Sequence, residues 1–367
     1  MYTQNEHHIN FNDVDKDAVN IIEKLTSQGH EAYIVGGAVR DLMLGKIPKD
    51  FDIVTNASPS KIKRVFRNSR IIGRRFRLVH VYYGDKIFEV STFRSMKDGP
   101  TSNTYGKIEE DVLRRDFTLN AFFYDPREQI VIDYVHGMKD MKAKQIRPII
   151  PLPIIFHDDP VRMIRAGKYA ATTGFKLPWR VKWQIKKDAP LLAGVSPSRL
   201  TEEIFKIINS SKASVIVEFL EGLGLYQYLQ PNASKLMKDD PGYRERYISG
   251  FTLTPEIIEE TKFLPGSPMI SLIRDYLESR IDWTNASNET YKEAFTLARN
   301  FVLPVNPPRI QLERAIKHIF RDHGITVKKS RPGKPQEAEG KKPDGKTPAK
   351  KRRKRRKKTG SVPVNAE

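Results

Sequence analysis

The sequence predicts an α/β head, then all-α domains, then a disordered basic tail. Up to about residue 145, short strand-like runs alternate with segments of helical apolar spacing, which is typical of an α/β unit with a mixed sheet. From about residue 157 onward the strand signals vanish and the helical spacing continues. Beyond about residue 327 the chain has almost no apolar content, so burial cannot offset the entropy of folding.

Composition and charge exclude several classes of protein. The 367 residues are 39% hydrophobic and include no cysteine, so disulfides, thiolate metal sites and cysteine nucleophiles are excluded. No apolar run is long enough to span a membrane and the N-terminus lacks a signal-peptide pattern, so we expect a cytoplasmic protein. The formal net charge is +20, and residues 328–360 contribute 16 Lys or Arg against 3 Asp or Glu. Most of the excess positive charge therefore lies in the tail.

The head begins with a helix, a strand and a glycine turn. Residues 15–28 carry apolar side chains at helical spacing and are followed by Gly29, a frequent helix terminator. A strand is predicted at residues 32–35 and a second helix at 39–44, with the turn "GG" between them. The turn thus connects a strand to a helix.

The second predicted strand carries two closely spaced carboxylates. Residues 50–55, "DFDIVT", have the composition of a strand, whose two-residue period aims Asp50 and Asp52 at the same face. The remaining head elements are a helix at 59–68, strands at 77–83 and 86–93 joined by a Gly84-Asp85 turn, a helix at 109–123, and a strand pair around Asp125-Pro126.

The pair Asp50 and Asp52 is a candidate metal site. Two carboxylates on one strand face form a hard oxygen cluster suited to Mg²⁺, which completes its shell with water and substrate phosphates. Two such ions could activate an attacking hydroxyl and neutralise nucleotide phosphates. The alternative is coincidence, because Asp-X-Asp occurs often by chance in a chain with 44 acidic residues.

The glycine turn is a candidate phosphate site. Gly36 and Gly37 let the backbone approach a ligand closely at a helix start, and Arg40 is near enough in sequence to bind a triphosphate. Taken alone, a Gly-Gly pair after a strand is usually only a turn. The combination of a phosphate cradle with a carboxylate pair is what points to nucleotide transfer.

Further charged residues fit the same chemistry and also have ordinary structural interpretations. Glu89 is either a third carboxylate of the metal shell or the outward face of an edge strand. Arg114, Arg115 and Asp116 either bind phosphate and a ribose or metal, or form a solvated helix face.

A second constellation lies in "HDDPVRMIRAGKY". Asp159 and Arg162 are three residues apart, so on one helix they would be neighbours on the same face, with Arg165 one turn further. An acceptor beside a donor could pair with the edge of a nucleotide base. The alternative is an intrahelical ion pair worth a few tenths of a kcal/mol.

These stretches together resemble the class II nucleotidyltransferase family, which contains the CCA-adding tRNA nucleotidyltransferases and the bacterial poly(A) polymerases. The resemblance is carried by "VGGAVRDLMLGKIPKDFDIVT", "GRRFRLVHV", "FEVSTFR", "EEDVLRRDFTLNAFFY", "DYVHGMKDM" and "DDPVRMIRA", between about residues 15 and 230. It implies a polymerase-β-like head followed by helical neck and body domains. Two departures, Asp158 where the family usually has Glu and Lys168 where CCA-adding members tend to have Arg, concern nucleotide selection.

The resemblance implies roles for individual residues. Asp50 and Asp52 would be the metal-binding catalytic carboxylates, with Asp116 as a further active-site acid. Gly37 and Arg40 would contact the triphosphate with help from Arg115. The base-reading helix would carry Asp159, Arg162 and Arg165.

Two features favour the poly(A) polymerase branch. The stretch "FRNSRIIGRRFRLVHVYYGDKIFEVSTFR" is similar to the bacterial poly(A) polymerases, and so is a basic C-terminal extension. That extension contains nine consecutive basic residues, Lys350, Lys351, Arg352, Arg353, Lys354, Arg355, Arg356, Lys357 and Lys358. Such a tail would bind RNA phosphates without reading sequence. Its alternative role is a solubilising or localisation segment.

The predicted function is template-independent addition of AMP from ATP to RNA 3′ ends with release of pyrophosphate, dependent on Mg²⁺ or Mn²⁺. The substrates would be mRNA or other transcripts, and the sequence identifies no protein partner and no membrane contact. One alternative is CCA addition to tRNA, and another is a non-catalytic RNA-binding module. The predicted domains are a catalytic head at 1–147, a base-reading and RNA-binding neck at 148–215, a helical body at 216–327 and an RNA-binding tail at 328–367.

Overall fold

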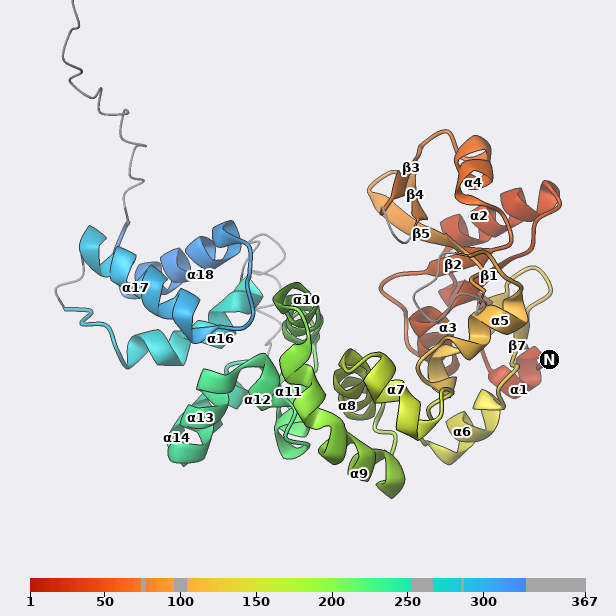
Figure 1. Cartoon of the computed structure of the whole chain (residues 1–367). Coiled ribbons are helices and arrows are strands. Elements are labelled where there is room, and N and C mark those ends of the chain that lie inside the picture. The colour runs from red at the N-terminus through yellow and green to blue at the C-terminus, as the bar shows by residue number, and fades with distance from the viewer. Residues whose placement is uncertain (74–76, 96–103, 253–266, 285–286, 328–367) are drawn as a thin grey trace, which may run out of the picture. The chain divides into compact units, whose positions relative to one another are not determined.

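The computed structural model describes residues 1–73, 77–95, 104–252, 267–284 and 287–327 (Figure 1). Residues 1–327 form one contact unit and residues 328–367 another. The predicted disordered tail and its nine consecutive basic residues therefore lie outside the described residues. No helix in the described ranges is both long enough and apolar enough to cross a membrane.

A seven-stranded sheet forms the head, in the order β3-β4-β5-β2-β1-β6-β7. The strands are β1 (Ala32–Val35), β2 (Asp52–Thr55), β3 (Ser69–Ile72), β4 (Leu78–Tyr83), β5 (Lys86–Thr92), β6 (Phe123–Asp125) and β7 (Ile130–Ile132). The pair β2 and β5 is parallel and the other pairs are antiparallel. The predicted mixed sheet is confirmed.

Helices cover both faces of this sheet. They are α1 (Gln4–His7), η1 (Phe11–Asp13), α2 (Lys16–Ser27), α3 (Gly37–Met43), α4 (Pro59–Val65), α5 (Ile108–Leu113), η2 (Thr118–Asn120) and α6 (Gly137–Ala143). On one face, Ile53 of β2 packs in the same core as the buried side of α2. On the other, Val54 packs in a smaller core with Ile108 and Val112 of α5. Successive side chains of β2 thus pack in two separate apolar cores, one on each face of the sheet.

Two head elements differ from the sequence predictions. The predicted helix at 109–123 is wrong in length, because α5 ends at Leu113. Beyond it, the Asp116 carboxylate accepts a hydrogen bond from the Phe117 amide (2.8 Å), and such local bonds compete with helix formation. Strand β3 was not predicted, and the helix expected to extend to residue 68 ends at Val65.

From residue 152 to 327, the part of the chain that the structure describes is mainly helical, as predicted. Its elements are α7 (Leu152–Asp158), α8 (Val161–Thr173), α9 (Trp179–Asp188), η3 (Ala189–Gly194), α10 (Pro197–Ile208), α11 (Ala213–Gly222), α12 (Tyr226–Leu229), α13 (Pro231–Asp239), α14 (Pro241–Ser249), α16 (Ser267–Glu278), α17 (Asn288–Phe301) and α18 (Arg309–Asp322). The segment "DDPVRMIRAGKYAATTG" is not one helix. Asp159 is extended (φ −149°, ψ 98°), since the residue before a proline is disfavoured in the helical region.

Candidate functional site

One row of side chains crosses the sheet face that carries the predicted carboxylates. His80 of β4 pairs with Glu89 of β5, and the parallel register of β5 and β2 places Glu89 beside Asp52. The row continues to Val35 and Phe123, which are buried in the smaller apolar core. The polar half of the row is more accessible, with Glu89 and Asp52 exposed to solvent. The topology therefore brings charged residues from three strands together beside an apolar support.

The charge at this point of the sheet is excessively negative. The pKa of Asp52 is raised to about 6, first by burial of the carboxyl group and then by the like charges of Glu89 and Asp50. Arg115 acts in the opposite direction without cancelling the effect. Although protein atoms crowd the group, the Asp52 side chain keeps an exposed surface. An accessible, uncompensated carboxylate cluster is suited to receive a cation.

The cluster was predicted to combine Asp50 and Asp52 on one strand with Glu89 either in the metal shell or on an edge strand. Asp50 is exposed and lies before β2, which begins at Asp52, while Phe51 between them is buried. Glu89 lies in β5, which has neighbours on both sides, so the edge-strand interpretation is wrong. Its Oε1 lies 3.5 Å from Nε2 of His80.

The donor set fits a hard divalent ion. Asp50, Asp52 and Glu89 offer only carboxylate oxygens, which Mg²⁺ and Mn²⁺ prefer. Among the described residues, no three His, Asp or Glu side chains are arranged as a ready metal-binding group. The fit therefore rests on the chemistry of the donors and on the uncompensated charge at Asp52.

The glycine turn has an unusual backbone conformation and lies close to two arginines. Gly36 has φ +71° and ψ −129°, a conformation that side chains rarely adopt, and α3 begins at Gly37, two residues earlier than predicted. A Cβ on Gly36 would lie 3.9 Å from Nη1 of Arg115, and one on Gly37 would lie 3.5 Å from Nη2 of Arg40. Two guanidinium groups therefore lie close to the turn.

Arg115 is held rigidly in this position. Its Nη2 donates to Asp111 (2.9 Å) and its Nη1 to the carbonyl of Asn120 (3.1 Å). The guanidinium also lies over the ring of Phe123, 4.9 Å from its centroid. Its Nε is buried and has no hydrogen-bond partner among the described residues. The Nη1 atom, which lies near the glycine turn, is thus already bonded to the protein.

Asn120 links the predicted acid Asp116 to the predicted phosphate ligand Arg40. The side-chain Nδ2 of Asn120 donates to Asp116 (3.2 Å), and its side-chain Oδ1 accepts from Nη1 of Arg40 (2.8 Å). Arg40 also donates to Asp41 (2.9 Å) and lies over the ring of Tyr169. The sequence analysis did not single out Asn120, although it lies within the quoted stretch "EEDVLRRDFTLNAFFY". Its bridging position was not visible without the fold.

The three predicted base-reading residues do not form the expected helix face. Arg162 is buried and donates to Asp158 (2.6 Å), so the ion pair joins it to Asp158 and not to Asp159. Asp159 lies outside α8 and accepts two bonds from Nη2 of Arg199 in α10 (2.8 and 2.9 Å). Pro160 is the physical reason, since it separates α7 from α8.

Arg165 connects the head to a buried acid in α10. Its Nη1 lies 3.7 Å from Asp116 and its Nε 3.4 Å from Glu203. Glu203 is 2% exposed and also pairs with Lys168 and Lys206. Burial raises the pKa of Glu203, but the cations Lys168 and Arg165 outweigh it and the net shift is downward. The sequence analysis missed both Arg199 and Glu203. Arg199 is 40 residues from Asp159, and Glu203 is 38 residues from Arg165. Only the pair of Glu203 with Lys206 lies within one helical turn.

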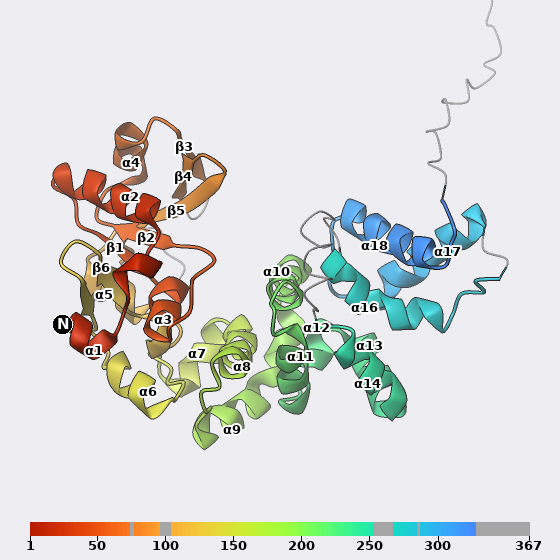
Figure 2. The same ribbon diagram turned by 180° about the vertical axis from the view of Figure 1, so that it is seen from behind.

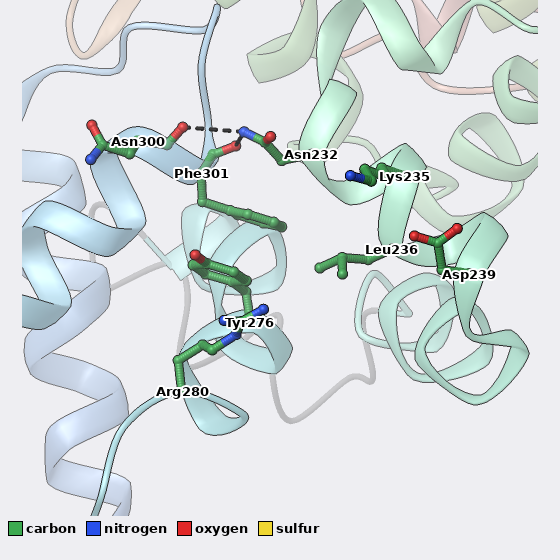
Figure 3. Close-up of a pocket in the computed structure, with 8 residues that line it drawn as sticks. All are labelled: Asn232, Lys235, Leu236, Asp239, Tyr276, Arg280, Asn300 and Phe301. Atoms are coloured by element: carbon green, nitrogen blue, oxygen red, sulfur yellow. Dashed lines mark hydrogen bonds between the residues drawn. The ribbon is translucent and has the colours of Figure 1, made fainter.

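A cavity of about 450 Å³ lies among α13, α16 and α17 (Figure 3). The rings of Tyr276 and Phe301 stack along it with centroids 4.0 Å apart. Its lining residues are Asn232, Lys235, Leu236, Asp239, Tyr276, Arg280, Asn300 and Phe301. None of them belongs to the predicted catalytic or nucleotide-binding set, so this cavity is separate from the sheet site.

Comparison with known proteins identifies the family of this chain. A family model described as the poly A polymerase head domain matches residues 32–147. A second model, described as the probable RNA and SrmB-binding site of polymerase A, matches residues 174–237. The poly(A) polymerase I of Haemophilus influenzae is 34% identical over 330 residues, which cover 84% of this chain and 73% of that protein. The chain belongs to the poly(A) polymerase family of nucleotidyltransferases.

The CCA-adding members of this wider family are also similar. The CCA-adding enzyme of Geobacillus kaustophilus is 36% identical over 227 residues, covering 60% of this chain and 56% of that enzyme. The crystal structure of the Bacillus stearothermophilus CCA-adding enzyme in complex with CTP matches with a TM-score of 0.56 and 26% identity, covering 84% of this chain and 82% of that one. The predicted family and fold class are confirmed.

Proposed function

We propose that this protein is a poly(A) polymerase that adds AMP from ATP to RNA 3′ ends without a template and releases pyrophosphate. The observation that carries the proposal is the reach of the similarity. The poly(A) polymerase I of Haemophilus influenzae aligns with 84% of the chain, whereas the CCA-adding enzyme of Geobacillus kaustophilus aligns with 60%. The likeness to the polymerase therefore extends over more of the chain.

In this proposal the glycine turn and its two arginines bind the triphosphate. Gly36 allows the backbone to turn where a side chain would be strained, and Arg40 and Arg115 bring positive charge close to the turn. Because both guanidinium groups are fixed by existing hydrogen bonds, they can stabilise charge without reorganising.

Asp50 and Asp52 would hold the catalytic metal, with Glu89 as a third carboxylate. Bound there, Mg²⁺ or Mn²⁺ would activate the RNA 3′-hydroxyl and neutralise the phosphates of ATP. Asp52 must be deprotonated to act as a metal ligand. Its raised pKa applies to the metal-free protein, in which no cation balances the negative charges of Glu89 and Asp50. Asp116, fixed by Asn120, would orient the sugar or the metal shell.

Nucleotide selection is proposed for the segment around α8. Asp159 and Arg165 keep partly accessible side chains, whereas Arg162 is nearly covered. Arg162 would therefore act mainly by fixing Asp158, while Asp159 and Arg165 face the base. Their present partners, Arg199 and Glu203, would set the position of each donor and acceptor.

RNA would be held by the parts of the chain beyond the head. We assign chemistry to residues 1–147, base selection and RNA binding to 148–215, the helical body to 216–327, and a phosphate grip to residues 328–367. The substrates would be transcripts in the cytoplasm, consistent with a role in RNA processing and decay. Deleting residues 328–367 should weaken binding of generic RNA and flatten its dependence on salt. A truncated protein with an unchanged salt slope would remove the tail from the proposal.

CCA addition to tRNA is the second candidate, because a CTP-bound CCA-adding enzyme shares the fold. The deciding experiment extends two end-labelled RNAs, a generic oligonucleotide and a tRNA lacking its terminal CCA, with each nucleoside triphosphate supplied singly and together. We expect long tails on both RNAs with ATP alone. Addition confined to the tRNA, requiring CTP and stopping at three residues, would establish the second candidate instead.

A further inference from the structure

Helix α9 (Trp179–Asp188) has one buried side and one open side. The buried side is formed by Val181, Gln184, Ile185 and Asp188. The helix packs against α7, and in both views it lies next to α7 and α8 (Figures 1 and 2). The open side, which we term the tryptophan face, consists of Trp179, Arg180, Lys182, Trp183, Lys186 and Lys187.

The two tryptophans are not part of the core. Trp179 is 71% exposed and Trp183 is 57% exposed, although large aromatic side chains normally gain free energy from burial. They are four residues apart, so they project from the same side of the helix about 6 Å apart along its axis. Because Val181 and Ile185 already attach α9 to the protein, the fold does not require either indole ring.

The charges around the indoles have one sign. On a helical projection, Lys182 and Lys186 flank the tryptophans on one side, and Arg180 and Lys187 flank them on the other. Two of the cations lie over the rings, Arg180 over Trp179 and Lys187 over Trp183, each 5.5 Å from the centroid.

The acid on this helix does not offset those charges at the surface. Asp188 is 4% exposed and accepts a hydrogen bond from Gln184 (2.7 Å). It therefore belongs to the buried side of α9. The open side presents four cations to solvent with no acid among its six residues.

We propose that the tryptophan face binds single-stranded RNA, with bases stacked on Trp179 and Trp183 and phosphates paired with the flanking cations. Every base has a face that can stack on an indole, and phosphates require the positive charge that surrounds the rings. A protein partner with an apolar surface would not need four cations around two rings, so the charge favours RNA. The inference rests on the proposed function in that the bound RNA is the polymerase substrate upstream of its 3′ end.

The first experiment uses the fluorescence of the tryptophans themselves. The chain has three tryptophans, and the third, Trp283, stacks on His323 in another part of the fold. A Trp283→Phe variant therefore reports only from Trp179 and Trp183 while keeping an aromatic ring at position 283. Titration with a single-stranded RNA that carries a 3′-deoxy end, without ATP, should quench this fluorescence to saturation.

The same titration has a matched control. A fully paired RNA duplex of the same length carries comparable phosphates but no free base faces, so it should quench much less. Equal quenching by both forms would contradict stacking, and no quenching by either would overturn the proposal. Because no turnover is needed, this result is independent of whether the protein proves to be a poly(A) polymerase.

The second experiment measures the contribution to substrate binding. Because one stacked base is worth about 1–3 kcal/mol, the double variant Trp179→Ala, Trp183→Ala should raise KM for single-stranded RNA about tenfold or more. KM for ATP should not change. The double variant with Phe at both positions keeps stacking surfaces and should recover most of the loss. If KM for RNA is unchanged in the alanine variant, the face serves another ligand, such as a protein, and the proposal fails.

Replacing Lys182 and Lys186 with Gln separates charge from stacking. Log affinity falls with log salt, and loss of two phosphate contacts should make this slope less steep by roughly 1.4, at about 0.7 per contact for a single strand. The saturating quench at high RNA concentration should remain, because both indoles are intact. A slope equal to that of the unmodified protein would contradict the assignment of these lysines to phosphates.

Discussion

The acids of the sheet site lie beside other acids, whereas the acids of the neighbouring helices each pair with a basic side chain. On the sheet, Asp52 is raised in pKa to about 6 by burial and by the like charges of Glu89 and Asp50. Around α8 and α10, each acid is matched by a basic partner. Asp158 pairs with Arg162, Asp159 with Arg199, and Glu203 with Arg165, Lys168 and Lys206.

In the proposed function, this difference would separate the two tasks of the transferase. A paired acid is satisfied by the protein and fixes the direction of its partner, as needed for recognising a base. An unpaired acid cluster costs stability and is retained where a ligand supplies the missing charge. The comparison therefore predicts opposite effects for similar substitutions, a loss of stability in the helices and a gain on the sheet.

The largest expected effect is the loss of catalysis on replacing Asp52. Asp52→Asn removes a metal-binding charge without changing the shape of the side chain, and incorporation of labelled ATP should fall by about 10³-fold or more. RNA affinity, measured separately, should stay close to that of the unmodified protein. Asp85→Asn, which removes an exposed acid from the turn after β4, is the matched control and should retain full activity. Appreciable turnover by Asp52→Asn would remove Asp52 from the metal site.

The next largest effect is on stability, at Glu203. Glu203→Gln leaves Arg165, Lys168 and Lys206 without their shared buried acid, and removing one partner of a buried pair typically costs about 3–5 kcal/mol. Glu202→Gln is the control, because Glu202 is exposed and its single pair with Lys206 is worth only about 0.3–0.5 kcal/mol. Denaturant unfolding at neutral pH measures both. Similar losses for the two variants would show that the cluster does not stabilise the fold.

The pH dependence of this stability follows from the pKa of Glu203. That pKa is lowered in the folded protein, so ionisation of Glu203 favours folding at neutral pH. The advantage of the unmodified protein over Glu203→Gln should therefore shrink as the pH falls through the acid range. A difference that is constant with pH would indicate a packing effect instead.

The stability effect of replacing Asp52 should depend on pH in the opposite direction to that of Glu203, and the change should be smaller. Its pKa is raised from 3.8 to about 6 in the folded protein, so ionisation opposes folding and the cost appears as the pH rises between these values. Without divalent metal, Asp52→Asn should unfold at a higher temperature than the unmodified protein above pH 6, and at nearly the same temperature below pH 4.

Added Mg²⁺ provides the counterpart to that measurement. It should raise the unfolding temperature of the unmodified protein, because a ligand that binds only the folded state stabilises it. Asp52→Asn should gain much less. A stabilisation by Mg²⁺ that is the same in both proteins would place the metal elsewhere.

In the head, the signals for the candidate site are mostly local in the sequence. The two-residue alternation predicted a strand at residues 50–55, but β2 begins at Asp52 and Asp50 lies before it. Both carboxylates are exposed and Phe51 between them is buried. The position of Glu89 beside Asp52 depends on the parallel register of β5 and β2, which connects residues more than 30 apart. Alternation alone therefore left Glu89 with two interpretations, and the topology excluded the edge-strand one.

The helical side was predicted less well because its pairs are remote or interrupted. Spacing suggested that Asp159 and Arg162 share a helix face, yet Pro160 directs Asp159 toward Arg199 in α10. The helix expected at 109–123 ends at Leu113, and the side chain of Asp116 beyond it bonds to the backbone instead of continuing a helix. Similarly, the exposure of Trp179 and Trp183 could not be read from their spacing, which a buried stripe would share.

The smallest expected effect concerns Arg199, which positions Asp159. The pair is partly exposed, so its loss should change stability by less than about 1 kcal/mol. In Arg199→Gln, Asp159 is no longer held by two bonds, so we expect KM for ATP to rise a few-fold and the preference for ATP over CTP to fall. Arg199→Lys keeps the charge but not the planar fork, so it should recover only part of the preference. If both variants keep the original ratio of kcat/KM for the two nucleotides, Asp159 does not read the base, and the paired acids around α8 serve only the fold.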